Sequence, residues 1–386
     1  MTDAAPLPSP IDSWRDRWTG SPDGVVVLDL GLQPASDLFP APGDPEPDPE
    51  YSVRMVFGTT SNLLQLEDDP TEPEEPLGVE PRALVEQAEK CVTDLAAAGF
   101  VVEGTRFVDY PSPHGGSWTP QLTLRGATKV DAGPADLVVD VHGMMHDREQ
   151  RPAFVERLEH LDDDGVVAMM IHNVASILRV GMWNALKSGH FAYYSTPALV
   201  SMANEIGLTA VGAWEYPLYQ NGTTMLVFAK DGSRWGGQAP EVTALIERET
   251  AEGITDPERV AALGRALEES VASIRAYLSD ATGRGLTVAG YGAASRTSSL
   301  LQCAGVTKAD MVTVADAATG KHGLTMPGNR IPIVSPQDLV GLRPDRVLLF
   351  VPDLLPEVRK ALPAIEANGG RWVVLEPMPH EVEPLA

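Results

Sequence analysis

The chain has 386 residues, enough for more than one hydrophobic core, and its 43% hydrophobic and 22% charged residues are typical of a globular protein. Its formal net charge of −25 excludes nucleic acid and anionic membrane surfaces as expected partners, because both repel an acidic protein. The only two cysteines, Cys91 and Cys303, are far apart in sequence, which excludes a disulfide framework and a four-cysteine zinc site.

The N-terminal region, residues 1–76, combines two predicted strands with acidic, proline-rich loops. The strands are VVVLDL and YSVRMVF, and the loops are PAPGDPEPDPE and EDDPTEPEEP. The opening MTDAAPLPSPIDSW lacks the basic and apolar parts of a secretory signal, and runs such as VVAMMI are too short to cross a bilayer. We therefore expect a small irregular region in a cytoplasmic protein.

The second region, residues 77–238, alternates predicted helices with buried strands. A helix spans residues 81–99, opened by a proline and closed by a glycine. Strands follow in FVVEG, ADLVVDVHG and DGVVAMMIHN, with a helix in RPAFVERLEHLDD. TPALVSMANEIGLTAVGAWEY adds a helix and a strand, and NGTTMLVFAKDG is expected to close the sheet as an antiparallel edge strand. This alternation predicts a parallel, doubly wound sheet.

The remaining sequence predicts a helical connector, residues 239–285, and a second domain, residues 286–386. The second domain begins with strand, glycine-rich turn and helix in LTVAGYGAASRTSSLLQCAGV, and continues with the strands MVTVADA, RVLLFVP and RWVVLEP. The expected fold class is therefore α/β, with two Rossmann-like doubly wound domains joined by a helical connector.

The glycine-rich turn is the first candidate binding site. In VAGYGAAS, Gly290 and Gly292 would let backbone amides and a helix N-terminus face a phosphate. Arg296 and Ser298 add donors at the start of the helix. Ser295 replaces the third glycine of a dinucleotide fingerprint, so a tight turn without a ligand is the alternative reading.

Two histidine segments are the next candidates. VHGMMHD places His142 and His146 four residues apart at a strand end, but no third metal ligand is suitably spaced nearby, so a histidine facing a cleft is the better interpretation. LKSGHFAYYS places His190 in a turn beside aromatic residues. A half-buried structural histidine is the alternative interpretation of His190.

The C-terminal half resembles the sugar C-methyltransferase family, which methylates the carbon next to a ketone in TDP-deoxysugars of antibiotic biosynthesis. The resemblance runs through GYGAASRTSSLLQCAG, DAATGKHGLTMPGNRIPIVSPQDL, RPDRVLLFVPDLLPEV and NGGRWVVLEP, in that order. It implies S-adenosylmethionine (SAM) as methyl donor and a nucleotide sugar as substrate. Arg296 and Lys321 stand at lysine positions of the family.

The resemblance extends upstream through HFAYYSTPALVSMANEIGL. It places His190 at the last histidine of the family's Tyr-His-Glu-His motif, the base that removes the acidic proton, and His146 at a second active-site histidine. Tyr193 and Tyr194, with the neighbouring phenylalanine, would form the wall of the pocket. Lys187 replaces the motif's tyrosine, where its charge would stabilise an enolate.

The remaining candidate positions concern cofactors and substrate. Gly58 and Ser61 stand where the family has a cysteine pair, so no zinc is expected. The SAM-binding strand and its glycine-rich loop should fall between LLQL and LGVEPRALVEQAEK, where only an acidic run lies, so this would be a degenerate member. Glu80 is the candidate to hold ribose hydroxyls at the end of the second strand, and Asn221 is a further candidate substrate contact.

Three hypotheses follow. The first is a SAM-dependent C-methyltransferase of natural-product biosynthesis. The second is a SAM-independent enzyme on the same scaffold that keeps the carbon-acid chemistry, such as an epimerase, lyase or cyclase, because proton abstraction needs only a base and an enolate stabiliser. The third is a non-catalytic partner of a biosynthetic enzyme. The substrate could equally be a polyketide or amino-acid intermediate.

Overall fold

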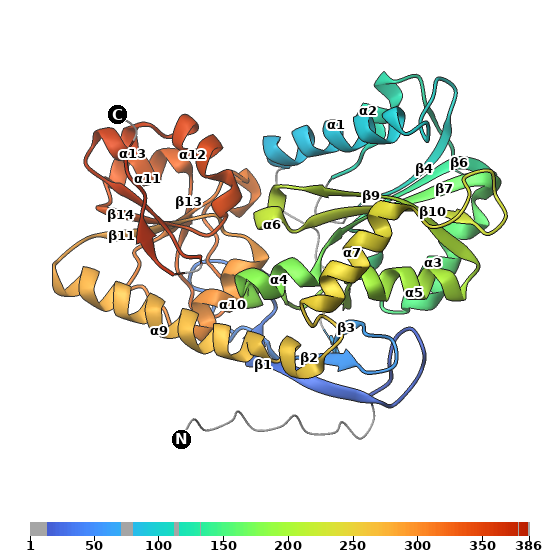
Figure 1. Ribbon diagram of the computed structural model, residues 1–386. Coiled ribbons are helices and arrows are strands. Elements are labelled where there is room, and N and C mark those ends of the chain that lie inside the picture. Colours follow the sequence, from blue (N-terminus) through green and yellow to red (C-terminus); the bar gives the residue numbers. More distant parts are fainter. Residues whose placement is uncertain (1–13, 71–79, 112–115, 132, 377, 385–386) are drawn as a thin grey trace.

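The computed structural model describes residues 14–70, 80–111, 116–131, 133–376 and 378–384 and contains three β-sheets (Figure 1). The strand pattern confirms the α/β fold class. Within the described ranges, no helix is both long and apolar enough to cross a membrane.

The N-terminal sheet is antiparallel and more regular than the composition of this region indicates. Its order is β1-β2-β3-β8, from β1 (Gly24–Pro34), β2 (Glu50–Gly58), β3 (Leu64–Leu66) and β8 (Ala192–Tyr193). The two residues of β8 come from the segment that follows His190. This segment is therefore hydrogen-bonded into a sheet formed more than a hundred residues earlier in the chain.

The middle sheet has the order β5-β4-β6-β7-β10-β9. Its strands are β4 (Arg106–Pro111), β5 (Thr128–Lys129), β6 (Ala135–Val141), β7 (Leu161–His172), β9 (Leu208–Tyr216) and β10 (Thr223–Lys230). The first four are parallel, and β10 is antiparallel to both its neighbours. The expectation that β10 forms the edge was wrong. Seven of its eight residues are buried, so it needs neighbours on both sides, whereas β9 alternates and takes the edge.

Helices cover both faces of the middle sheet (Figure 1). On one face lie α1 (Arg82–Ala97) and α2 (Thr119–Leu124), which share a core with alternate residues of β6 and β7. On the other face lie α3 (Gln150–Glu159), α5 (Thr196–Glu205) and α7 (Pro240–Ala251). Shorter helical segments occur at the carboxyl end of the sheet: η1 (Met144–His146), α4 (Val174–Val180), η2 (Trp183–Ala185) and α6 (Leu218–Asn221).

The predicted strand in FVVEG was wrong. Phe100 and Val101 are buried but form the turn that leaves α1, and Gly104 has a φ of +87°, which ends any extended run. The strand begins at Arg106 instead. The first strand of the parallel sheet therefore follows α1 rather than preceding it. Glu80, which lies exposed just before α1, is consequently not at the end of the second strand.

The C-terminal sheet has the order β13-β12-β11-β14-β15-β16 and is parallel except at β16. Its strands are β11 (Val288–Tyr291), β12 (Val314–Ala315), β13 (Ile333–Val334), β14 (Arg346–Leu349), β15 (Arg371–Val374) and β16 (His380–Glu381). Its helical segments are α10 (Ser295–Cys303), η3 (Thr319–Lys321), α11 (Pro336–Leu342), η4 (Pro352–Leu354), α12 (Leu355–Ala361) and α13 (Ala364–Ala367).

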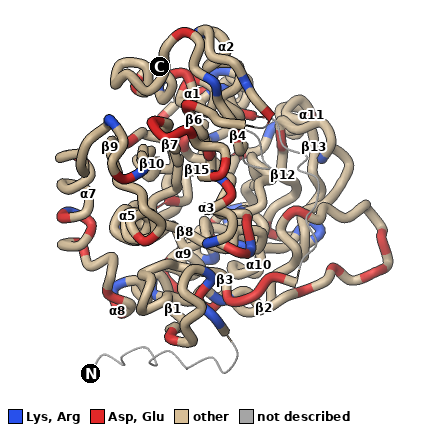
Figure 2. The backbone as a smooth tube through the Cα atoms, turned by 90° about the vertical axis from the view of Figure 1, so that its right-hand side faces the viewer, with Lys and Arg blue, Asp and Glu red and all other residues tan. Residues whose placement is uncertain are grey.

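The expected helical stretch between the two α/β parts is present, in three pieces: α7, α8 (Pro257–Val260) and α9 (Ala262–Gly283). α7 packs on α5 and β9, whereas α9 contacts both β1 and β11. In Figure 1, α9 runs along the lower side of the C-terminal sheet toward the N-terminal sheet. Figure 2 shows acidic and basic residues spread over all three parts of the molecule, with the acidic ones in excess.

Candidate functional site

A buried ion pair shapes the turn that follows β6. The Asp140 carboxylate accepts hydrogen bonds from the amides of Gly143 at 2.8 Å and Met144 at 3.1 Å, and from Arg157 Nε at 2.6 Å. Arg157 is 3% exposed and also bonds Asp147. Because the turn and α3 are fixed through one carboxylate, the histidines on either side of the turn have defined positions.

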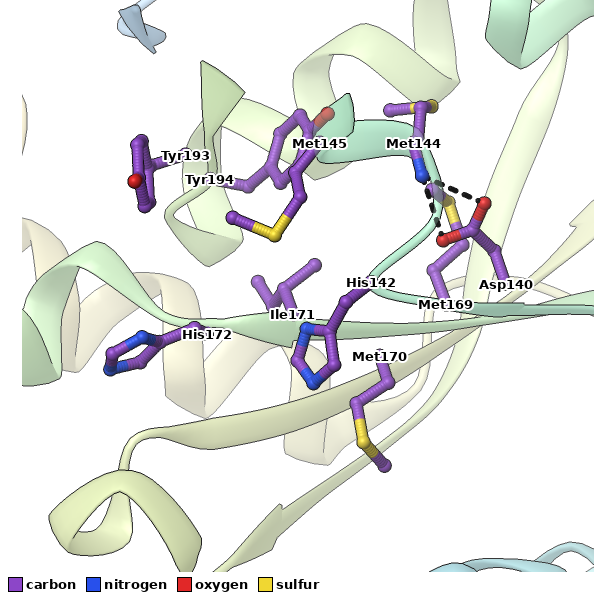
Figure 3. Close-up of a pocket in the computed structure, with 10 residues that line it drawn as sticks. All are labelled: Asp140, His142, Met144, Met145, Met169, Met170, Ile171, His172, Tyr193 and Tyr194. Atoms are coloured by element: carbon purple, nitrogen blue, oxygen red, sulfur yellow. Dashed lines mark hydrogen bonds between the residues drawn. The ribbon is translucent and has the colours of Figure 1, made fainter. Parts of the chain in front are cut away.

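A narrow cavity lies at the carboxyl ends of β6 and β7 (Figure 3). Its lining is rich in methionine and aromatic side chains: Asp140, His142, Met144, Met145, Met169, Met170, Ile171, His172, Tyr193 and Tyr194. In Figure 3, Ile171 and Met145 extend toward the two tyrosines, whereas the rings of His142 and His172 turn away from them. Tyr193 and Tyr194 thus line this cavity.

His190 is half-buried beside this wall. Its Nδ1 lies 2.9 Å from the Tyr193 hydroxyl, which itself lies 2.7 Å from the carbonyl of Ala185 and 3.2 Å from the amide of Lys187. The hydroxyl must donate to the carbonyl and accept from the amide, so Nδ1 of a neutral His190 donates to the hydroxyl and carries the ring proton. The lone pair of the neutral ring is then on Nε2, which is the basic nitrogen of that tautomer.

His146 stands next to His190 with the same tautomer. Its Nδ1 donates to the carbonyl of Gly189 at 2.9 Å, and the two imidazole rings meet edge to face with centroids 4.6 Å apart. Phe191, expected in the pocket wall, lies instead between the guanidinium groups of Arg17 and Arg148, at 4.9 and 4.8 Å. The structure therefore brings the two histidines together, whereas Phe191 packs against two arginines.

Lys187 already has partners of its own. It is 5% exposed, and its Nζ lies 3.3 Å from both Asp37 Oδ2 and the carbonyl of Ser188. Asp37 also accepts from Ser295 at 2.5 Å. The lysine thus links the His190 segment to the start of α10, and an ion-paired ammonium is a weaker enolate stabiliser than a free one.

His142 and His172 form a second histidine pair, which the sequence analysis did not connect. Tyr219 stacks on His172 with centroids 4.8 Å apart and meets His142 edge to face at 6.1 Å. Burial lowers the pKa of His142 to about 4. Burial lowers the pKa of His172 to about 3, with smaller contributions from His142 and Arg296. Both rings are therefore neutral at pH 7.

The backbone around His142 and Tyr219 is strained. His142 has a φ of +59°, and Tyr219, Gln220 and Asn221 form three successive residues with φ between 55° and 61°. Such conformations are rare outside glycine and persist where surrounding contacts enforce them. The amides of Tyr219 and Gln220 both donate to the Asp353 carboxylate at 3.1 Å. Asn221 is exposed beside them.

In the glycine-rich turn of the C-terminal sheet, several of the candidate ligand-binding residues are packed against or bonded to the protein itself. A Cβ on Gly290 would lie 2.6 Å from Phe350, and Gly292 has a φ of +98°. Ser298 is fully buried inside α10, and Lys321 Nζ donates to the carbonyl of Ala293 at 2.8 Å. Of these candidates, Arg296 has its Nη1 3.7 Å from Met182 Sδ, and its charge acts on the nearby Glu376.

The carboxyl end of β4 holds a residue that sequence reasoning missed. Asp109 Oδ2 accepts from Ser117 at 2.5 Å and from Thr119 at 2.8 Å, whereas Oδ1 is buried with no hydrogen-bond partner in the described part of the chain. Gly116, with a φ of +98°, precedes Ser117. The signal was present in FVDYPSPHGGSW: an acidic residue at a strand end, a glycine pair and a helix start.

The described residues contain no group of three histidine, cysteine or acidic side chains suited to a metal ion. The carboxyl edge of the middle sheet therefore presents two kinds of chemistry. One is the edge-to-face pair of His146 and His190 beside a methionine-lined cavity. The other is the pair of His142 and His172, which is neutral at pH 7 and packs against Tyr219.

Comparisons with known proteins agree with the C-terminal motifs. Residues 220–379 match the family described as the C-methyltransferase C-terminal domain. The chain is 28% identical over 222 residues to the C-methyltransferase NovU of Streptomyces niveus, which covers 58% of this chain and 52% of NovU. The chain thus matches about half the length of this curated relative.

Solved structures of methyltransferases are also similar. The N-methyltransferase NodS of Bradyrhizobium japonicum is 14% identical with a TM-score of 0.28, covering 40% of this chain and 99% of NodS. The magnesium protoporphyrin IX methyltransferase of Synechocystis, with bound SAH, is 10% identical with a TM-score of 0.28, covering 38% and 83%. The fold class rests on the strand order described above.

Proposed function

Through residues 220–379 this chain belongs to the C-methyltransferase family, and on that premise we propose that it transfers a methyl group from SAM to a carbon of a small natural-product intermediate. A carbon becomes nucleophilic when a base removes a proton next to a carbonyl. The proposal therefore requires a base, a site for the methyl donor and a site for the acceptor.

The observation that carries the proposal is the His190–His146 pair. Backbone and hydroxyl contacts hold both Nδ1 protons, so both rings offer Nε2 as the basic atom. A neutral imidazole near pH 7 has the acidity expected of a general base. Tyr193 joins His190 to the wall of the cavity, so His190 would accept the acidic proton at Nε2 and His146 would support it.

The carboxyl end of β4 supports a site for SAM. SAM supplies an electrophilic methyl group and carries an ammonium group that needs an anionic partner. The buried Oδ1 of Asp109, without a described partner, is a suitable acceptor for it. Asp131, exposed just after β5, takes the place first assigned to Glu80 as the partner for ribose hydroxyls.

A binding measurement tests the cofactor part. SAM at millimolar concentration should raise the melting temperature of the purified chain, because a ligand that binds only the folded state stabilises it. Asp109→Asn should remove this shift, whereas Glu80→Gln, a matched change on the exposed segment before α1, should retain it.

The same measurement separates the base from the cofactor site. His190→Gln should keep the SAM-induced shift but lose methyl transfer. Absence of a shift in the unaltered protein would contradict SAM dependence and favour cofactor-independent carbon-acid chemistry. Retained methyl transfer in His190→Gln would contradict the assignment of the base.

A further inference from the structure

A cluster of polar side chains lies where the middle sheet meets the C-terminal part, and the proposed mechanism does not use it. We call it the seam cluster: His142, His172, Tyr219, Arg296 and Glu376. Tyr219 stacks on His172 and meets His142 edge to face, and the neighbouring Gln220 bonds Glu376. The charge of Arg296 acts on His172, Tyr219 and Glu376, which places the guanidinium near all three.

The two imidazoles of the seam cluster have unused hydrogen-bonding capacity. The Nε2 atoms of His142 and His172 are both buried and have no partner among the residues that the structure describes. Buried polar atoms are nearly always satisfied, so these two nitrogens require a partner from outside the described residues, such as a ligand atom or a water. Because both rings are uncharged at neutral pH, they suit an uncharged oxygen such as a carbonyl rather than a phosphate.

Among the residues that the structure describes, Arg296 is the cation of the seam cluster and the candidate to hold an anionic ligand. The other cations near α10 are engaged, Lys187 with Asp37 and Lys321 with the carbonyl of Ala293. The neighbouring carboxyl, Glu376, accepts from Gln220; burial raises its pKa, and the nearby charge of Arg296 acts in the opposite direction. One guanidinium in a chain of net charge −25 matches a singly charged carboxylate better than a diphosphate.

The C-terminal part holds this arrangement in place. Asp353 accepts the amides of Tyr219 and Gln220 and thereby maintains their left-handed conformation. Tyr219 in turn lies against both imidazoles and presents an aromatic face. A guanidinium, two neutral imidazoles and an aromatic ring are therefore gathered at the carboxyl ends of β6 and β7, where open α/β sheets bind ligands.

We propose that the seam cluster binds a 2-oxo carboxylate, with Arg296 holding the carboxylate and the imidazoles of His142 and His172 bonding the keto oxygen. This assignment deepens the proposed function and rests on it, since such a compound has an acidic C–H next to its carbonyl. It differs from the nucleotide sugar that the sequence resemblance implied.

Calorimetric titration of the full chain without SAM tests the proposal. The probes are phenylpyruvate and 2-oxobutyrate, with 3-phenylpropionate as the analogue lacking the ketone and thymidine diphosphate as the nucleotide. We expect phenylpyruvate to bind roughly tenfold or more tightly than either 3-phenylpropionate or thymidine diphosphate. Arg296→Gln should weaken phenylpyruvate binding by roughly ten- to a hundredfold, and Arg284→Gln, an exposed arginine of the connector, should leave it unchanged.

A second variant examines the imidazole contact without removing charge. His172→Phe should narrow the difference in affinity between phenylpyruvate and 3-phenylpropionate, because it lacks one of the two imidazoles that recognise the ketone. Its melting temperature reports whether it is folded, and Arg296→Lys provides a milder test of the carboxylate contact. Tighter binding of thymidine diphosphate, no binding of either keto acid, or unchanged binding by Arg296→Gln would each overturn the proposal. The SAM-induced thermal shift is measured separately, so failure of the proposed function is distinguishable.

Discussion

His142 and His172 have folded-state pKa values of about 4 and 3, below the ordinary value of 6.5. The unfolded chain therefore takes up protons that the folded chain excludes as the pH falls below 6.5. Stability that both rings contribute above pH 6.5 is lost on acidification through this range, by up to about 1.4 kcal/mol per pH unit for each ring.

This predicts acid sensitivity well above the pH at which carboxylates protonate. The free energy of unfolding in urea, measured at pH 7, 6 and 5, should fall more steeply for the unaltered chain than for His172→Phe, which lacks one of the two groups. Equal slopes for the two proteins would contradict the burial of this imidazole.

Arg157 provides a second prediction at the residue scale. Arg157→Met leaves the buried Asp140 carboxylate without its cation, and removing one partner of a buried pair costs about 3–5 kcal/mol. Arg248→Met breaks the exposed pair with Glu215 and should cost less than about 1 kcal/mol. Urea unfolding of both variants measures the contrast, and similar losses would disagree with it.

The candidate site could be predicted from sequence only in part. His190, His146 and the two tyrosines were found because they lie close together in sequence or match a family motif. His172 and Tyr219 were missed because their contact depends on the order of the strands in the sheet and on a left-handed turn at Tyr219. No local sequence pattern predicts either feature. Asp109 was missed because the strand before it was placed several residues too early.

At the scale of the element, β11 depends on a glycine that is tightly enclosed. A Cβ at Gly290 would lie 2.6 Å from Phe350 and 3.0 Å from Met311, so Gly290→Ala should destabilise the chain by about 1–3 kcal/mol. Gly341 in α11 has no atom within 4 Å of such a Cβ, and Gly341→Ala should stabilise by about 0.5 kcal/mol. Thermal unfolding of the pair checks this, and the reverse order would refute it.

Long periodic elements were predicted well, and short ones were not. The helix at α1 and the strands β6 and β7 agree with the expectation because each has many apolar residues in a regular pattern. β8 has two residues and exists only because β3 is available as a partner. No sequence rule identifies so short a strand, since its hydrogen bonds are entirely long-range.

At the scale of the whole molecule, charge affects stability as well as partner choice. A net charge of −25 makes the folded state repel itself, and salt shortens the range of that repulsion. Raising NaCl from about 10 to about 150 mM should therefore increase the melting temperature at pH 7.5. A decrease would indicate that screened ion pairs outweigh the net repulsion. The net charge follows directly from the composition, whereas the arrangement of the three sheets depends on long-range pairing that the sequence does not show.

The pairing of β3 with β8 also constrains when the protein can fold during synthesis. Leu64–Leu66 leave the ribosome long before Ala192–Tyr193. The helices α9 and α10, which pack against β1, are synthesised later still. Strands with unpaired edges are exposed to aggregation during such delays. The proline-rich, acidic segments beside β2 and β3 would shield these early strands from neighbouring nascent chains until their distant partners are translated.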